Sequence, residues 1–329
     1  MPGFLHPLAL PFCNNWYYTP DPQALESLAA HGKKITFLIP FWFGVTSRGT
    51  LEDQSDEEAL ILVRRFKLPV LAIVHNYSSP RYGPLIHRLL TDENLRRTLV
   101  ASIREMLLRR GFAGVNIDFE FVPPEDRPFL TRFQTELFQA LKPQDFFVTI
   151  SVPAELEDNP RHPFSGAFSY PDLAAVSDQM YVLAYDEHFA EPGPIASLGF
   201  VEQVMNYALT AIPREKIFWG LPVYGYDWAP GARVPETLSH AEAIARAQRF
   251  GAQIRYDEQA QESTYTYVEN GVRHVVWFED AKSFQVKLNL IVKKRLPGIG
   301  VWRLGLEDPK IWDLLEKSWY FEHPAFAPR

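Results

Sequence analysis

Short apolar segments rich in β-branched and aromatic residues recur along the 329-residue chain, and stretches with helical periodicity separate them. These segments are apolar almost throughout, which is typical of parallel strands covered by helices on both faces. Strands alternating with helices over this length predict a (β/α)8 TIM barrel, an α/β fold, as one domain over residues 1–329. The predicted strands are Leu8–Phe12, Ile35–Phe41, Val70–His75, Gly114–Glu120, Phe146–Val152, Gln179–Tyr185, Ile217–Val223 and Ile299–Leu304.

Helices are expected in most of the gaps between these strands. The helix expected over Pro22–His31 ends at Gly32, which suits a helix C-cap. The helix expected over Asp56–Phe66 begins acidic and ends basic, as the helix dipole favours. Four more helices are predicted over Asp92–Arg110, Asp126–Leu141, Leu198–Ala211 and Asp280–Arg295.

The gap between the seventh and eighth predicted strands is more than twice the usual length. We assign its residues 229–279 to a small α+β insertion, which should rise beside the mouth of the barrel because loops after strands emerge there. Ser239 and Glu242 form a capping-box pattern, and Asn270-Gly271 is a strong hairpin signal. The expected strands of the insertion are Gln253–Tyr256, Thr264–Val268 and Val272–Phe278.

A row of polar residues ends the fourth predicted strand. Asn116, Asp118 and Glu120 are spaced two apart, so they share one face of the strand, and Glu120 is expected at its C-terminal tip. Two carboxylates and an amide on a buried strand are costly unless they are paired or used. The pattern fits a catalytic site at the barrel mouth, and it also fits a buried hydrogen-bonded network without a catalytic task.

Other strands also end in polar and aromatic residues. The sixth strand leads into Tyr185-Asp186-Glu187-His188, and the seventh into Tyr224-Gly225-Tyr226-Asp227-Trp228. Trp302 lies in the last strand, where packing in the core is the alternative to a role in binding. The aromatic share of 14% supplies flat apolar platforms of the kind that sugar-binding clefts use.

Composition narrows the classes of partner. The net charge of −7 argues against nucleic acid, which needs a basic surface. No apolar run is long enough for a membrane span, no secretory signal is visible, and Cys13 as the single cysteine allows no intrachain disulfide. No metal-ligand spacing and no phosphate-binding glycine loop point to a metal or an organic cofactor. We expect a monomer.

The strand with Asn116, Asp118 and Glu120 resembles the D-x-x-D-x-D-x-E motif of the family 18 glycoside hydrolases. The run ending in Tyr185-Asp186 resembles the M-x-Y-D motif of that family, and Trp302 matches its tryptophan on the eighth strand. The resemblance extends over nearly the whole chain. The first two Asp of the long motif are replaced by Ala113 and Asn116, and the Met of M-x-Y-D is Leu183.

Several later segments resemble the spore cortex-lytic N-acetylglucosaminidase branch of this family. These segments are Tyr185-Asp186-Glu187-His188, Tyr224-Gly225-Tyr226-Asp227-Trp228, Tyr256-Asp257-Glu258 and Val276-Trp277-Phe278-Glu279-Asp280. The resemblance implies a catalytic module without a preceding LysM segment, and a spore-associated or extracellular location.

The resemblance also implies a retaining mechanism in which the 2-acetamido group of the substrate attacks its own anomeric carbon. Glu120 would be the acid and then the base, Asp118 would orient the acetamide, and Tyr185 would donate to its oxygen. Asp186 would contact the sugar or the acid, and Trp302 would form the floor beneath the ring. The other residues assigned to substrate binding are Asn116, Tyr224 and Tyr226.

The substrate expected from the resemblance is a β-1,4-linked N-acetylglucosaminyl polymer, with peptidoglycan first and chitin or chito-oligosaccharide second. A sugar-binding protein without catalysis is the alternative of another class, because the family includes lectin-like barrels in which the acid is replaced. The presence of Glu120 discriminates against that alternative.

Overall fold

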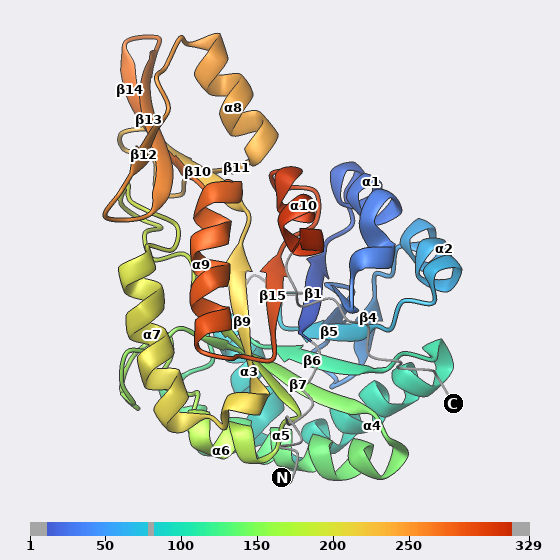
Figure 1. The fold of residues 1–329 in the computed structure, drawn as a ribbon. Coiled ribbons are helices and arrows are strands. Elements are labelled where there is room, and N and C mark those ends of the chain that lie inside the picture. The colour runs from blue at the N-terminus through green and yellow to red at the C-terminus, as the bar shows by residue number, and fades with distance from the viewer. Residues whose placement is uncertain (1–11, 78–81, 318–329) are drawn as a thin grey trace, which may run out of the picture.

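The computed structural model describes residues 12–77 and 82–317, and they confirm the prediction of a (β/α)8 barrel (Figure 1). The eight barrel strands are parallel and follow the order β2-β1-β15-β9-β8-β7-β6-β5. Their bounds are Cys13–Tyr18 (β1), Phe37–Pro40 (β2), Leu71–His75 (β5), Gly114–Asp118 (β6), Phe147–Pro153 (β7), Gln179–Leu183 (β8), Ile217–Pro222 (β9) and Gly298–Trp302 (β15).

The two ends of this sheet meet, so the barrel closes. Leu38 of β2 forms a parallel bridge with Val70, and its amide donates to the Pro69 carbonyl at 3.0 Å. A short hairpin extends the sheet beyond β5: β3 (Phe43–Val45) pairs with β5, and β4 (Leu51–Asp53) pairs with β3.

The first barrel strand is not where the sequence placed it. The prediction of a strand over Leu8–Phe12 lies, except for Phe12, outside the described residues, and β1 runs over Cys13–Tyr18 instead. Two buried amides, Asn14 and Asn15, open this strand and hide its β pattern. Both amide nitrogens find partners in the fold: Asn14 Nδ2 donates to the Lys34 carbonyl, and Asn15 Nδ2 donates to the Tyr181 hydroxyl. The other seven predicted strands overlap the observed ones.

Helices surround the barrel, as Figure 1 shows. Aspartates cap the helices Pro22–His31, Glu57–Phe66 and Glu93–Arg110: Asp21 accepts from the Ala24 amide, Asp56 from the Glu58 amide and Asp92 from the Asn94 amide. The sequence did not predict α3, α6 and α10. The bounds are Pro22–His31 (α1), Glu57–Phe66 (α2), Tyr82–Thr91 (α3), Glu93–Arg110 (α4), Arg127–Leu141 (α5), Tyr170–Ala175 (α6), Leu198–Ala211 (α7), Ala281–Lys293 (α9) and Lys310–Lys317 (α10), with 3-10 turns at Gly32–Lys34, Pro124–Asp126, Lys142–Gln144 and Arg214–Lys216.

Side chains along each barrel strand point alternately to two apolar layers, one between the strands and the helices and one inside the barrel. Outward residues pack against the helices, as Val115 and Ile117 do on β6. A separate cluster fills the barrel interior and includes Tyr17, Phe37, Ile39, Leu71, Ile73, Tyr181 and Phe218. This cluster packs the barrel interior, as in other barrels of this kind, where binding sites lie at the C-terminal ends of the strands. No helix within residues 12–77 and 82–317 is both long enough and apolar enough to cross a membrane.

A second, antiparallel sheet follows β9 and projects beyond α9 (Figure 1). Its order is β11-β10-β14-β13-β12. The hairpin turn between β13 and β14 is confirmed as Asn270-Gly271, both with positive φ, and Ser239 and Glu242 form the predicted capping box. The elements are β10 (Tyr224–Trp228), β11 (Glu236–Ser239), α8 (His240–Arg249), β12 (Arg255–Asp257), β13 (Glu262–Glu269) and β14 (Val272–Phe278).

Candidate active site

Asn116 is the lowest member of the polar row on β6, and both its amide nitrogen and its amide oxygen form hydrogen bonds. It is buried, its Nδ2 donates to Thr149 Oγ1 at 3.0 Å, and its Oδ1 accepts from Ser151 Oγ at 2.8 Å. The Thr149 hydroxyl donates a hydrogen bond to the Val115 carbonyl at 3.0 Å. Asn116 therefore supports the site from inside the barrel. Ala113, where the family motif has Asp, packs against the apolar cluster of the interior.

Asp118 and Glu120, here called the acid pair, stand at the tip of β6 and just beyond it. Asp118 is 5% exposed and Glu120 is half-buried. Burial raises the pKa of Asp118 to about 8, with the charge of Glu120 as the second cause. Burial also raises the pKa of Glu120, and the charge of Asp186 adds to the rise. Within the part of the chain that the structure describes, no lysine or arginine forms an ion pair with either carboxyl group.

The turn that follows β5 holds Glu120, a contact that sequence analysis did not predict. Asn76 Oδ1 accepts from the Glu120 amide at 2.9 Å, and Asn76 Nδ2 donates to the Glu120 carbonyl at 2.7 Å. The Tyr77 hydroxyl donates to Glu120 Oε2. The neighbouring His75 is buried and stacks on Phe41 with ring centroids 3.8 Å apart.

Asp186 lies across the site in a left-handed backbone conformation, with φ of 57°. Its Oδ1 accepts hydrogen bonds from the Tyr224 hydroxyl and from the Tyr226 hydroxyl, the latter at 2.8 Å. Asp186 is partly exposed to solvent. Burial among the surrounding groups raises its pKa, and the hydrogen bonds from the two tyrosines lower it. We assigned Tyr224 and Tyr226 to substrate binding; their hydroxyls hold Asp186.

Tyr185 is close enough to the acid pair and to Asp186 for their charges to act on its hydroxyl. Its ring stands perpendicular to that of Tyr224, with centroids 6.3 Å apart. A Cβ at Gly220 would come within 3.1 Å of this ring, so the glycine leaves the room that Tyr185 needs. Burial raises the pKa of Tyr185 well above its usual value, and nearby tyrosine and carboxyl groups add to the rise. Tyr185 therefore keeps its proton and can act as a donor.

Trp302 ends β15 at the same mouth and is partly exposed. Its ring contacts Tyr17, with centroids 5.4 Å apart, and Phe41, with centroids 6.2 Å apart. These contacts hold the indole in place, and its exposed part can serve as a flat apolar platform.

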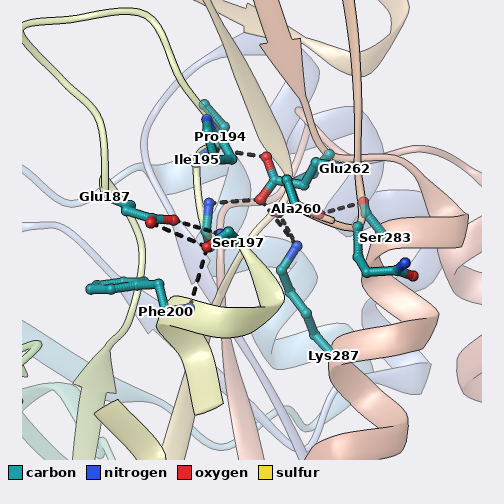
Figure 2. A network of polar contacts seen from close by, with 12 residues as sticks. Glu187, Pro194, Ile195, Ser197, Phe200, Ala260, Glu262, Ser283 and Lys287 are labelled. Carbon is teal, nitrogen blue, oxygen red and sulfur yellow. Dashed lines mark hydrogen bonds and ion pairs between the residues drawn. The ribbon is translucent and has the colours of Figure 1, made fainter. Parts of the chain in front are cut away.

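The loop that begins at Asp186 is tied to the second sheet, as Figure 2 shows. Glu187 accepts from the Ser197 amide at 2.7 Å. Glu262 of β13 accepts from the amides of Ile195 and Ala196 at 2.8 and 2.7 Å and pairs with Lys287 of α9 at 3.3 Å. The second sheet thus helps to place Asp186.

Glu262, Glu279 and Lys287 are here called the Lys287 cluster, and all three side chains are at most 1% exposed. Lys287 Nζ lies 2.5 Å from Glu279 Oε1. Burial alone would lower the pKa of Lys287, but the two glutamates raise it, so this side chain stays charged.

The described residues contain no group of three or more His, Cys, Asp or Glu side chains arranged to hold a metal ion. At the mouth, the acid pair can transfer protons, Tyr185 and Asp186 can form hydrogen bonds, and Trp302 offers apolar contact.

Comparison with known proteins places this geometry in a family. Residues 14–307 match glycosyl hydrolases family 18. The putative sporulation-specific glycosylase YdhD of Bacillus subtilis is 32% identical over 295 residues, which are 87% of this chain and 69% of that protein. The cortical fragment-lytic enzyme of Bacillus anthracis is 29% identical over 293 residues, 86% of this chain and 68% of the enzyme.

Solved structures agree with these matches. The spore cortex-lytic enzyme SleL of Bacillus cereus superposes with a TM-score of 0.87 at 27% identity, over 93% of this chain and 73% of that one. A chitinase from Chromobacterium violaceum superposes with a TM-score of 0.87 at 26% identity, over 95% of this chain and 100% of that one.

Proposed function

The chain belongs to glycosyl hydrolases family 18 and is a glycoside hydrolase, and we propose that it cleaves β-1,4-linked N-acetylglucosaminyl bonds of peptidoglycan, especially in spore cortex fragments. The similarity to cortical fragment-lytic enzymes and to SleL supports this choice of substrate. The observation that carries the proposal is the acid pair, two neighbouring carboxyl groups with raised pKa values and no facing cation among the described residues.

Catalysis proceeds with retention of configuration and with assistance from the substrate, as in other members of this family. The carbonyl oxygen of the 2-acetamido group attacks the anomeric carbon, and Glu120 donates its proton to the departing glycosidic oxygen. The resulting oxazolinium ion is opened by water, and Glu120 takes a proton from that water. The raised pKa suits this double role, because Glu120 must give up and regain a proton near working pH.

Asp118 and Tyr185 act on the acetamide. Asp118 accepts from the acetamide N–H and balances the positive charge of the oxazolinium ion. Tyr185 donates to the acetamide oxygen, which requires a protonated hydroxyl, and burial supports that state by raising its pKa. Asn116 fixes the strand beneath Asp118 through Thr149 and Ser151.

The opposite side of the site positions the sugar ring. Trp302 packs beneath the ring and its acetamide methyl group. Asp186 accepts from a sugar hydroxyl, while Tyr224 and Tyr226 hold its carboxylate in place from behind.

A chitinase or chito-oligosaccharide hydrolase is the second candidate. It is favoured by the likeness to the Chromobacterium violaceum chitinase, since that chain is covered along its whole length. Both substrates share the same linkage, so the acid pair and the acetamide contacts serve either of them.

The test is mass spectrometry of the products from cortex peptidoglycan, vegetative peptidoglycan and a chitin oligosaccharide, each incubated with the wild type and with Glu120→Gln. We expect cleavage after N-acetylglucosamine in cortex peptidoglycan and no products from the variant. Preferred cleavage of the chitin oligosaccharide would select the second candidate. Hydrolysis of a deacetylated substrate at an undiminished rate would exclude substrate assistance.

If all three glycans remain uncleaved but bind to the wild type, a lectin-like role without catalysis replaces the proposal. Sensitivity to a thiazoline mimic of the oxazolinium ion is a further expected result, and a lack of inhibition would contradict the proposed intermediate.

A further inference from the structure

The segment His75-Asn76-Tyr77, which ends β5 and begins the following turn, holds both the backbone and the side chain of Glu120. Asn76 fixes its backbone through a reciprocal pair of hydrogen bonds at 2.9 and 2.7 Å. Tyr77 reaches its side chain, with the hydroxyl donating to Oε2. Among the described residues, no other side chain donates to the Glu120 carboxylate. The backbone position and the side-chain rotamer of Glu120 are therefore both specified by this turn.

Tyr77 is itself placed by aromatic contacts. Its amide donates to His75 Nδ1 at 3.2 Å. Its ring meets Phe41 edge-on, with centroids 5.9 Å apart and planes at 62°. Phe41 in turn contacts Trp302, so one line of rings connects the proposed sugar platform to the residue that holds Glu120. Tyr77 is 37% exposed, so part of its side chain faces solvent beside Glu120.

His75 is a neutral part of this support. Its Nδ1 accepts from the Tyr77 amide, so the proton of the neutral ring lies on Nε2. Burial lowers the pKa of His75 to about 4, and the ring therefore carries no charge at neutral pH. The turn lies beside the acid pair and contacts the Glu120 carboxylate through a neutral group, the Tyr77 hydroxyl.

Building on the proposed function, we propose that Tyr77 is a positioning residue for the acid: it engages Oε2 of Glu120, so that Oε1 carries the proton and faces the glycosidic oxygen. In the first step the proton leaves Oε1 for the departing oxygen, and the Tyr77 hydroxyl stabilises the carboxylate that remains. In the second step Oε1 takes a proton from the attacking water. The Tyr77 proton stays on Tyr77 in both steps.

Tyr77→Phe tests this role, because it keeps the ring and its contact with Phe41 while it removes the hydroxyl. The carboxylate form of Glu120 loses its donor, so the basic limb of the pH profile of kcat/KM should move up by roughly 1 pH unit. At the optimum we expect kcat to fall roughly tenfold with little change in KM, since the bond strengthens as charge develops on Glu120. A merely structural role of Tyr77 would leave the pH profile in place.

Tyr256→Phe is the matched control. It removes a tyrosine hydroxyl that bonds Gln261 at 3.2 Å, in the second sheet and outside the proposed machinery. Its pH profile should coincide with that of the wild type. An unshifted profile for Tyr77→Phe, with wild-type kcat, would overturn the proposal and leave the proposed function standing.

A titration that does not depend on turnover separates the two proposals. The pKa of Glu120 can be followed by NMR of carboxyl-labelled glutamate, with Glu120→Gln assigning the signal by its loss. We expect a higher pKa in Tyr77→Phe than in the wild type, even if no glycan proves to be a substrate. Equal values in the two proteins would contradict the role of Tyr77 directly.

Discussion

Two groups of buried carboxyl groups in this molecule have opposite surroundings. In the Lys287 cluster, Glu262 and Glu279 face a charged lysine, with Nζ at 3.3 and 2.5 Å from their oxygens. In the acid pair, the Glu120 carboxylate accepts from the Tyr77 hydroxyl, and neither Asp118 nor Glu120 forms an ion pair with a described residue. The cation in the first group offsets part of the cost of burying its carboxyl groups, although burial still raises the pKa of Glu279. The second group lacks that compensation, so its protons can be exchanged near neutral pH.

The comparison shows how the fold assigns different tasks to one residue type. The Lys287 cluster joins β13 to α9 and holds the loop that begins at Asp186 (Figure 2). The acid pair stands where the barrel opens, and burial works against its charges. Replacing members of each group should therefore affect different quantities, namely activity in one and stability in the other.

The largest expected effect is on activity. Glu120→Gln keeps the shape of the side chain and removes the transferable proton, so kcat should fall by roughly 10²–10⁴-fold. The midpoint of unfolding in denaturant should not decrease, because the variant removes a partly buried carboxylate. Turnover close to that of the wild type would break the assignment of Glu120, and a large loss of stability would break the contrast with the Lys287 cluster.

The next effect is on stability. Lys287→Met leaves two buried carboxyl groups without their cation and should lower the free energy of unfolding by about 3–5 kcal/mol. The measurement is equilibrium unfolding in urea. Lys293→Met is the matched control, because Lys293 is an exposed lysine on the same helix, and it should change stability by less than about 0.5 kcal/mol. Equal unfolding midpoints for the two variants would remove the structural role of the cluster.

The smallest expected effect is the pH dependence of stability that the acid pair adds through Asp118. The pKa of Asp118 is about 8 in the folded protein against an unfolded value near 3.8. The folded state therefore binds the extra proton, and stability declines as pH rises from about 4 to 8. Asp118→Asn lacks this titration, so it should match the wild type near pH 4 and exceed it by roughly 1–3 kcal/mol at pH 8. Parallel stability curves for the two proteins would show that Asp118 is not strained by its burial.

The prediction from sequence succeeded where local pattern decides structure. The alternation on β6 correctly separated Asn116 and Asp118 from Val115 and Ile117, since period two is a property of the strand itself. The hairpin at Asn270-Gly271 and the capping box at Ser239 were predicted for the same reason, because turn and cap chemistry lies within a few residues.

Contacts between distant segments were beyond such reasoning. Nothing near Tyr77 reveals that its hydroxyl reaches Glu120, 43 residues away. Tyr224 and Tyr226 were recognised as site residues, but the carboxylate they hold belongs to another strand exit, at Asp186. The first strand was misplaced because Asn14 and Asn15 look unsuited to a buried strand. Their hydrogen-bond partners, the Lys34 carbonyl and the Tyr181 hydroxyl, are distant in the sequence.

The second sheet joins the barrel through two neighbouring strands. A single residue, Val223, separates β9 from β10, and Gly225 of β10 pairs with Phe278 at the end of β14. The Glu279 amide donates to the Tyr224 carbonyl at 3.0 Å, so the chain leaves the sheet beside the point where it entered. A segment whose two ends lie side by side can be acquired or exchanged during evolution without displacing its host. Through this junction the second sheet beside the barrel mouth can change in evolution, while β6, the strand that bears the acid pair, stays the same.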